Sequence, residues 1–484
     1  MIQRQIVIVG AGPAGMAAAT AVEQAGITPT VIDENSQVGG QIYRQPSASF
    51  ISRDQEGSNR VPNTDDSIRV EFLKHADRIE VLNDTTVWGV FPEKQLAVRR
   101  DDGWQMIQAE QLVLTTGAYE FVSPFPGWTL PGVMTPGGAQ SMVKAMKVLP
   151  GKRVLVAGSG PFLLVVAHQL HAAGMEVVGV VEAVARGRVV RHARGLLANL
   201  KMLGEGRRYF RELHKAGIPM HWNHVVVEAR GDDGLCEVDF APCDSQWRAD
   251  SDRLRSVEVD TLCIGYGFVP RIELPQLIGC RLRFENLLGG WVPEVDDQFQ
   301  SSVPGVFVAG DGGGVAGAVV AQIEGALAGM AAAHRAGWLD DVDYRARRRP
   351  LLQRLAKLRR FRASLDRIYQ IGSGLVDLPR DDTIVCRCEE VTLAEAESGI
   401  KYGGEDFPTL KVMTRLGMGL CQGQMCWPAM ARRIAAQTGK QPGACGPRSV
   451  RPPTQPLLVG DLLDQAVGLP LSAPACGNTD GVES

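Results

Sequence analysis

Long apolar runs are missing from this 484-residue sequence. No stretch of about 18 or more apolar residues occurs, so we do not expect a membrane-spanning helix. An excess of charge of one sign is missing as well: 51 Lys and Arg face 54 Asp and Glu, a net charge of −3. This near balance gives no indication of a nucleic-acid partner. The N-terminus lacks a charged segment and a cleavage site, so we expect a cytoplasmic protein, with a peripheral position at the inner membrane as the alternative.

Cysteine is present, but not in the pattern of a redox dithiol. None of the ten cysteines belongs to a C-x-x-C pair. In a cytosolic chain they indicate thiols or metal ligands rather than disulfides. The length leaves room for two or three domains, and a hydrophobic fraction of 45% is enough to give each a core.

The clearest motif is a glycine-rich turn near the N-terminus. An apolar run predicts a buried strand, a G-x-G-x-x-G turn follows, and a helix of small residues comes next. The three glycines permit a tight turn, backbone approach to a pyrophosphate and close packing of helix on strand, while the helix N-terminus binds the phosphates. The sequence therefore predicts an adenine dinucleotide. The residues concerned are Gly10, Gly12 and Gly15 in the turn, and Asp33 or Glu34 as the ribose ligand, with Glu34 favoured.

Three further segments resemble flavoproteins of the glutathione reductase and thioredoxin reductase type. Residues 38–43 (VGGQIY) resemble their second glycine pair, residues 112–118 (LVLTTGA) their strand and T-G turn, and residues 305–311 (GVFVAGD) the segment whose Asp contacts the ribityl chain. The resemblance implies FAD. The additional residues that it places near FAD are Gly40, Gln41, Arg44, Val87, Thr116, Gly117, Gly310 and Asp311.

A second module repeats the strand, turn and helix of the first. Gly158 and Gly160 form the turn and Glu182 ends the following strand, but Leu163 stands where the third glycine is expected. A bulky residue there should loosen the packing of helix on strand. Three interpretations stay open: a nicotinamide site in which Glu182 favours a free ribose hydroxyl, a site for another adenine nucleotide such as ATP, and an empty scaffold.

These motifs predict an α/β fold with two dinucleotide-binding, Rossmann-like domains of the glutathione/thioredoxin reductase type and a small helical C-terminal domain. The FAD-binding domain is expected in two parts, because the chain is predicted to return to it through residues 261–267. The expected boundaries are 1–145 and 259–338 for the FAD domain, 146–258 for the second domain, 339–380 for a basic helical linker, 381–450 for the C-terminal domain and 451–484 for a tail.

Two segments outside these motifs have open interpretations. Residues 45–67 are polar and read either as an entry to the flavin or as a mobile surface excursion. Residues 341–369 are strongly basic, with leucines on one helical face. A solvated face is favoured there over a helix that docks another subunit.

A second cofactor is indicated by four cysteines near the C-terminus. They form a C-x-C pair, then a gap of 32 residues, then a C-x4-C pair. Four soft thiolates suit Zn or a 2Fe-2S cluster. The spacing resembles the bacterioferritin-associated ferredoxin-like module, which carries 2Fe-2S, although the second pair of that module is commonly C-x2-C. The predicted ligands are Cys386, Cys388, Cys421 and Cys426, with Zn and free thiols as the alternatives.

Taken together, the segments GAGPAGMAAA, GGQIYR, GWTLPGVMTPGGAQ, GSGP, CRCEEVT and GMGLCQGQMC resemble the large or alpha subunit of heteromeric flavoprotein dehydrogenases. These dehydrogenases include the opine oxidase, D-hydroxyproline dehydrogenase and hydrogen cyanide synthase types. The resemblance implies an oxidoreductase subunit that acts on CH-NH donors of the D-hydroxyproline, opine, proline or glycine class.

The same resemblance implies the partners of the chain. The first is a smaller flavoprotein subunit similar to D-amino acid oxidase, with a small third subunit left open. The electron acceptor is expected to be a quinone or a dye. A stand-alone NAD(P)H-dependent reductase of a ferredoxin or small molecule is the main alternative, and a non-catalytic iron-sulfur interaction module is the third.

Overall fold

A computed structural model describes residues 1–46, 67–100 and 103–460, and the segment predicted as a flavin entry lies mostly outside these ranges. The first domain is built on a seven-stranded sheet in the order β3-β2-β1-β6-β5-β4, with β19 paired to β6. Parallel pairs join β1 to β2 and to β6, while β4, β5 and β6 form an antiparallel meander. The strands are β1 (Ile2–Val9), β2 (Thr30–Ile32), β3 (Glu80–Leu82), β4 (Thr86–Phe91), β5 (Gln95–Arg100), β6 (Gly103–Leu114) and β19 (Val306–Val308).

Two helices of small residues cover this sheet, α1 (Pro13–Glu23) and α9 (Ala318–Arg335). Their backbones touch: a Cβ added at Gly325 would lie 2.0 Å from the carbonyl oxygen of Ala14, and one added at Gly329 would lie 2.4 Å from that of Ala18. The runs of Ala and Gly in both helices exist because nothing larger fits between them. This contact fixes the N-terminus of α1, and with it the glycine turn.

The second domain has a parallel sheet in the order β11-β10-β9-β15-β8, flanked by an antiparallel sheet β12-β13-β14. Its strands are β8 (Val133–Met134), β9 (Arg153–Gly158), β10 (Glu176–Glu182), β11 (Met220–Trp222), β12 (His224–Arg230), β13 (Glu237–Pro242), β14 (Arg255–Glu258) and β15 (Thr261–Gly265). Its helices are α3 (Pro136–Ser141), α4 (Phe162–Ala172), α5 (Arg186–Arg191), α6 (Ala193–Leu196) and α7 (Leu200–Lys215).

The structure corrects both predicted boundaries of the second domain. β15 lies between β9 and β8 in the second sheet, so residues 261–265 do not return the chain to the first domain. β8 and α3 likewise precede the predicted start at 146. The actual crossing is a two-stranded antiparallel ribbon of β7 (Ala118–Glu120) and β16 (Phe268–Pro270). The error arose because β15 repeats, within the second module, the apolar strand that ends β6 in the first.

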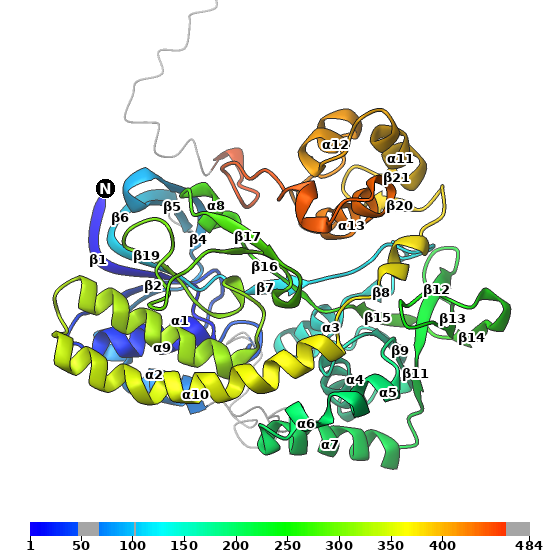
Figure 1. Ribbon diagram of the computed structural model, residues 1–484, viewed down its shortest axis with the longest axis horizontal. Helices are drawn as coiled ribbons and strands as arrows, with labels where there is room; N and C mark the ends of the chain where they lie inside the picture. Colours follow the sequence, from blue (N-terminus) through cyan, green and yellow to red (C-terminus); the bar gives the residue numbers. More distant parts are fainter. Residues whose placement is uncertain (47–66, 101–102, 461–484) are drawn as a thin grey trace, which may run out of the picture.

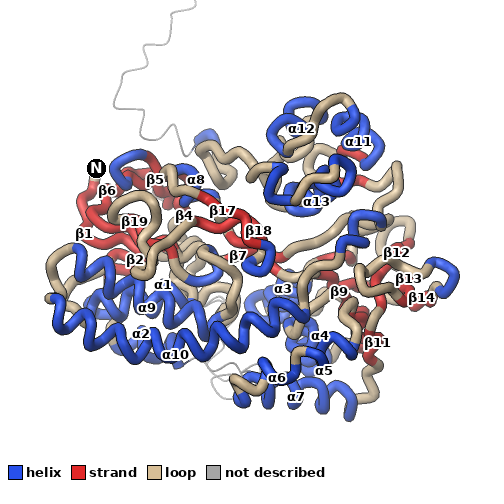
Figure 2. Tube along the Cα trace, in the orientation of Figure 1, coloured by secondary structure: helices blue, strands red, loops and turns tan. Residues whose placement is uncertain are grey.

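The remaining elements connect the domains. The predicted basic segment is one 28-residue helix, α10 (Asp341–Ile368), which runs beneath α9 and continues to α6 of the second domain (Figures 1 and 2). Leu355, Leu358 and Phe361 on its inner face are buried, and its other face is exposed. No helix in the described ranges is long and apolar enough to cross a bilayer.

The C-terminal domain is a cluster of short helices beside a two-stranded ribbon (Figure 1). Its first helix, α11, begins at a capping box formed by Thr392 and Glu395, where the Thr392 side chain accepts the N–H of Glu395 and the Glu395 carboxylate accepts that of Thr392. The elements are β20 (Ile384–Cys386), β21 (Val391–Thr392), α11 (Leu393–Lys401), α12 (Phe407–Thr414) and α13 (Trp427–Thr438), together with α2 (Ser67–Lys74), α8 (Glu273–Leu277), β17 (Leu282–Glu285) and β18 (Gly290–Pro293) elsewhere in the chain.

Candidate functional site

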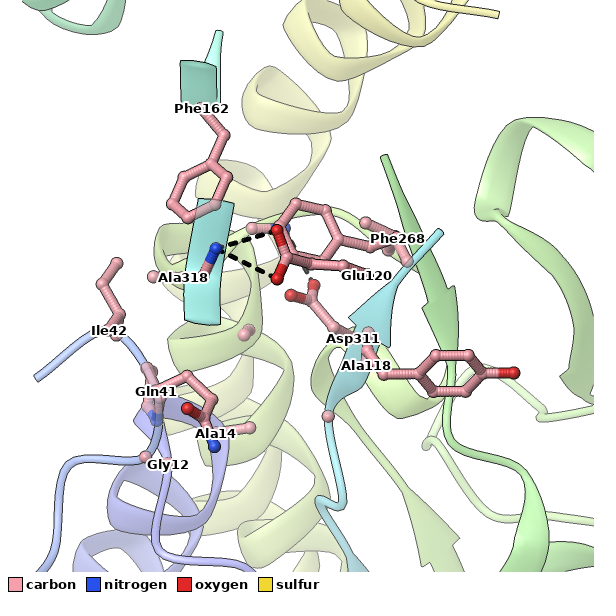
Figure 3. Close-up of a pocket in the computed structure, with 18 of the residues that line it drawn as sticks. Gly12, Ala14, Gln41, Ile42, Ala118, Glu120, Phe162, Phe268, Asp311 and Ala318 are labelled. Carbon is pink, nitrogen blue, oxygen red and sulfur yellow. Dashed lines mark hydrogen bonds between the residues drawn. The ribbon is translucent and has the colours of Figure 1, made fainter. Parts of the chain in front are cut away.

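A cavity of about 1610 Å³ lies between the glycine turns of the two domains. Residues from the first sheet, from α3, α7 and α10, and from the C-terminal domain contribute to its wall. Figure 3 shows part of the wall, including Gly12, Glu120 and Asp311. Small-molecule pockets usually span about 300–1000 Å³, so this cavity has room for a dinucleotide and more. All thirteen residues predicted near FAD line it except Gly15 and Gly310.

Gly15 and Gly310 do not line the cavity, but each allows a close contact next to it. A Cβ at Gly15 would lie 1.7 Å from the carbonyl oxygen of Gly10. Gly310 has a φ of +72°, and a Cβ there would lie 2.8 Å from the Cβ of Ala14. Gly40 approaches equally closely, because a Cβ there would lie 2.8 Å from the Cα of Gly12. The glycines therefore allow the close backbone approaches that build the turn at the cavity, which is the geometry a pyrophosphate site requires.

The two acids that end β2 have different surroundings. Asp33 is buried, and its carboxylate accepts the N–H of Ala11 at 2.5 Å and the N–H of Asn35 at 2.8 Å. Glu34 is exposed at the rim of the cavity, with one oxygen 3.9 Å from Arg271 Nη1. Asp33 therefore holds the turn in shape, whereas the carboxylate of Glu34 is open to a ligand. This geometry supports Glu34 as the ribose ligand.

Arg44 and Asp311 have structural partners at the cavity. Arg44 Nη2 donates to Asn35 Oδ1 at 2.9 Å. The Oδ1 atom of Asp311 accepts the N–H groups of Ala316 and Gly317, each at 2.9 Å, and so fixes the loop that leads into α9. Asp311, Glu120 and Ala118 all line the cavity (Figure 3).

Two charged residues of the cavity had no signal in the sequence. Both oxygens of Glu120 accept the N–H of Gly137 at 3.0 Å (Figure 3), and burial raises the pKa of this carboxyl. Lys144 is 7% exposed, donates to the carbonyl of Ile42 at 3.3 Å, and has its pKa lowered to about 8 by burial. A lysine within a segment of small and apolar residues is the one sequence feature that could have drawn attention to Lys144.

The turn of the second domain meets the same cavity through Ser159, Gly160 and Phe162. Leu163 is buried in the core of this domain, so α4 packs on its sheet with a leucine in place of the third glycine. The prediction for Glu182 needs correction. Its carboxylate is 2% exposed and accepts the N–H groups of Gly160 at 3.0 Å and Val184 at 2.9 Å. Glu182 thus braces the turn as Asp33 does, and its oxygens do not face a ribose.

The four predicted cysteine ligands gather as two pairs in the C-terminal domain. A hydrogen bond with the Cys426 thiol lowers the pKa of Cys386 to about 6, and the N–H of Gly417 also donates to Cys386 Sγ at 3.4 Å. Cys388 interacts with Cys421. As placed, no group of three or more His, Cys, Asp or Glu side chains in the described ranges could hold a metal ion. The four thiols that could bind a metal are therefore present as two separate pairs.

The C-x4-C loop forms part of the cavity wall. Two of the four residues between its cysteines, Gln424 and Met425, line the cavity, and Gln424 Nε2 donates to Glu273 Oε1 at 3.1 Å. The same carboxylate forms a buried ion pair with Arg448, whose Nη1 donates to the carbonyl of Gln422 at 2.9 Å. The spacing that departs from C-x2-C thus brings the loop to the cavity, a contact between distant segments that sequence cannot reveal.

Comparisons with known proteins agree with this architecture. Residues 4–325 match the family described as pyridine nucleotide-disulphide oxidoreductase. The chain is 38% identical over 435 residues to hydrogen cyanide synthase subunit HcnB of Pseudomonas aeruginosa, covering 90% of this chain and 93% of the relative. It is 33% identical over 471 residues to the opine oxidase A subunit of Rhizobium meliloti, covering 95% and 98%.

Solved structures share the fold. The L-proline dehydrogenase from P. horikoshii aligns with a TM-score of 0.67 at 22% identity, covering 95% of this chain and 79% of that one. A thioredoxin reductase from T. acidophilum aligns with a TM-score of 0.51 at 19% identity, covering 69% of this chain and 99% of that one. The predicted pair of Rossmann-like domains is thereby confirmed.

Proposed function

This chain belongs to the pyridine nucleotide-disulphide oxidoreductase family, among the large subunits of heteromeric amino-acid dehydrogenases, and from this premise we propose that it is their FAD- and 2Fe-2S-containing electron-transfer subunit. The complex oxidises a C–N bond of an amino or imino acid of the D-hydroxyproline, opine, proline or glycine class. Electrons pass through this chain to a quinone or dye-type acceptor.

The observation that carries the proposal is the shared cavity. One wall is the glycine turn, and another is the loop between Cys421 and Cys426. Gln424 and Met425, which lie between two of the thiols in the sequence, line the same cavity as the glycine turn. This arrangement supports an electron-transfer role.

The residues of the first domain fit FAD. Gly10 and Gly15 stand where a Cβ would collide with backbone, Glu34 is exposed at the cavity rim, and Asp311 holds the loop before α9. These residues would hold the pyrophosphate, the ribose and the ribityl chain, respectively. When bound, FAD would accept electrons in pairs and a cluster would carry them singly. Lys144, whose pKa burial lowers to about 8, and Glu120, whose pKa burial raises, would both lie at the cavity wall.

The cysteine loops fit a 2Fe-2S cluster by the chemistry of their donors. Four thiols in two pairs are the ligand set of such clusters, and a backbone N–H such as that of Gly417 is a typical hydrogen-bond donor to cluster sulfur. The thiol pairs do not form a metal site as placed among the described residues, so the cluster rests on this donor set and on the sequence pattern.

The partner of this chain is proposed from the names of its relatives. HcnB is a subunit of hydrogen cyanide synthase, and the Rhizobium meliloti relative is one subunit of opine oxidase. We infer a smaller flavoprotein subunit that binds the amino or imino acid and passes electrons to this chain. The substrate-binding residues then belong to that subunit.

The decisive experiment is anaerobic absorbance of the chain, purified with and without its co-expressed partner. Bleaching of the flavin and cluster bands by D-hydroxyproline or an opine, only when the partner is present, is the expected result. Bleaching of the isolated chain by NADH would instead favour a stand-alone NAD(P)H-dependent reductase. That second candidate is retained because Ser159, Gly160 and Phe162 of the second turn face the same cavity.

A further inference from the structure

Helix α7 of the second domain carries two apolar faces. The inner face holds Leu213, which is buried, and Met202 and Tyr209, which line the cavity. An amphipathic helix at a protein surface ordinarily has a single apolar face, turned to the core. The outer face of α7 therefore needs an explanation.

That outer face is a stripe at helical spacing. Leu200, Leu203, Arg207, Phe210 and His214 follow one another at intervals of three or four residues, and all five are exposed. Leu200 is 69% exposed, and the rings of Phe210 and His214 stack with an interplanar angle of 3°. The apolar part of the stripe is thus ordered on the surface and faces away from the core.

Two further exposed apolar side chains lie shortly before α7 in the chain, one in α5 and one directly after α6. Val190 is 73% exposed and Leu197 is 58% exposed. Figure 1 shows α6 and α7 along one edge of the second domain, on the side away from the C-terminal domain. We call residues 186–215 the basic apolar edge.

Charge on the basic apolar edge is strongly one-sided. Residues 186–215 contain nine Lys or Arg and two Glu, a net charge of +7, so the rest of the chain carries −10 of the total of −3. Among the described residues, Arg191, Arg194, Arg207 and Arg211 form no ion pair, and all four are exposed. These cations are therefore available to an external negative charge.

From this surface we propose that the basic apolar edge docks the protein on an anionic phospholipid bilayer, with α7 lying in the plane of the headgroups. Exposed aliphatic and aromatic side chains mixed with arginines are the composition of interfacial helices, because the apolar groups enter the acyl boundary while the long cationic side chains reach the headgroups. A second copy of this chain would bring a charge of +7 against another +7. The charge thus matches an anionic surface.

Docking by this edge has a consequence for the cavity. Met202, Glu205 and Tyr209 on the inner side of α7 line the cavity, so the helix that would lie on the bilayer also forms part of the cavity wall. The inference goes beyond the proposed function, since the surface is defined without reference to any cofactor.

The test is co-sedimentation of the full chain with vesicles of phosphatidylcholine containing about 30% phosphatidylglycerol, compared with vesicles of phosphatidylcholine alone. We expect binding to the anionic vesicles that weakens at high salt. The variants L200E/F210E and R207Q/R211Q should each lose roughly tenfold or more of the bound fraction.

The matched control is V342E/V412E, which introduces the same charge change at two residues that are 77% and 75% exposed in other parts of the chain. It should bind vesicles as the unmodified chain does, and all variants should keep the thermal midpoint. Absence of binding to anionic vesicles would overturn the proposal. So would equal losses in the control, or release of the smaller subunit by L200E/F210E with vesicle binding unchanged, which would assign the edge to that subunit.

Discussion

Arg448 and Glu273 form a buried ion pair between residues 175 positions apart in the sequence. The pair joins the segment that follows the C-terminal domain to α8, and Arg448 also donates to the carbonyl of Gln422 in the cysteine loop. This salt bridge therefore helps to hold the loop at the cavity, together with the hydrogen bond from Gln424 to Glu273.

Arg448→Met is expected to lower the free energy of unfolding by about 3–5 kcal/mol, because it leaves the Glu273 carboxylate buried without its partner. Urea unfolding measures the change. The control is Arg415→Met, which removes an ion pair to Glu389 in which Arg415 is largely exposed, and should cost under about 1 kcal/mol. Equal effects of the two variants would contradict a structural role for the Arg448 pair.

Gly15→Ala is expected to abolish FAD retention and to destabilise the fold by about 3 kcal/mol or more, because the added Cβ would meet the carbonyl oxygen of Gly10 at 1.7 Å. Flavin content after gel filtration and thermal unfolding measure both effects. Gly206→Ala, at an open position within α7, should stabilise by about 0.5–1 kcal/mol through helix propensity. Full flavin content in Gly15→Ala would show that the turn tolerates a side chain.

Substitutions of the two acidic residues after β2 should have different effects on FAD binding and on stability. Glu34→Gln is expected to weaken FAD binding roughly tenfold with little change in stability, through loss of a charged hydrogen-bond acceptor. Asp33→Asn should instead destabilise the fold by about 1–3 kcal/mol, because only one of the two carboxylate oxygens that accept from Ala11 and Asn35 is kept. Calorimetric FAD titration and thermal unfolding distinguish the two. Weaker FAD binding in Asp33→Asn alone would assign the ribose to Asp33.

Lys144 should give the chain a distinct pH dependence. Burial lowers its pKa to about 8 from 10.5, so between these values the unfolded chain binds more protons and stability rises with pH. Lys144→Met is expected to raise the free energy of unfolding at pH 7 by about 2 kcal/mol and to remove that rise. Urea midpoints of the flavin-free protein from pH 7 to 10 measure it. Parallel curves for both proteins would place the lysine in water.

Substitution of the predicted cysteine ligands should lower the iron content of the protein, and substitution of another cysteine should not. Cys386→Ser and Cys426→Ser are expected to lose bound iron and its visible absorbance, because each removes one of four thiolates. Cys236→Ser, at an exposed thiol outside the loops, should keep both. Metal analysis of the purified variants makes the comparison. Zinc in place of iron in the unmodified chain would contradict the cluster.

Local patterns were predicted well from the sequence because they depend on neighbours in the chain. The strand, turn and helix around Gly10 occur where the pattern indicates. The boundary at β15 was missed because its apolar run is indistinguishable from the corresponding strand of the first domain. The surroundings of Glu182 could not be foreseen, since the acid that ends such a strand can turn toward its own backbone or toward a ligand.

The contacts that build the cavity were the least accessible to prediction. Lys144 reaches Ile42 across 102 positions, and Gln424 reaches Glu273 across 151. No periodicity or motif encodes such a distance. Their positions follow from how the domains pack, which depends on the sum of many small apolar contacts.

Helix α10 ties the two dinucleotide-binding modules together. At about 1.5 Å per residue its 28 residues extend roughly 42 Å. Arg359 near its middle bonds Glu324 of α9 at 3.0 Å, while Ser364 near its end packs against Gly195 of α6. The helix thus contacts both modules, which the ribbon of β7 and β16 also connects. We therefore expect the two modules to move as one rigid body. The distance that electrons cross through the cavity would then stay constant, without a domain motion during transfer.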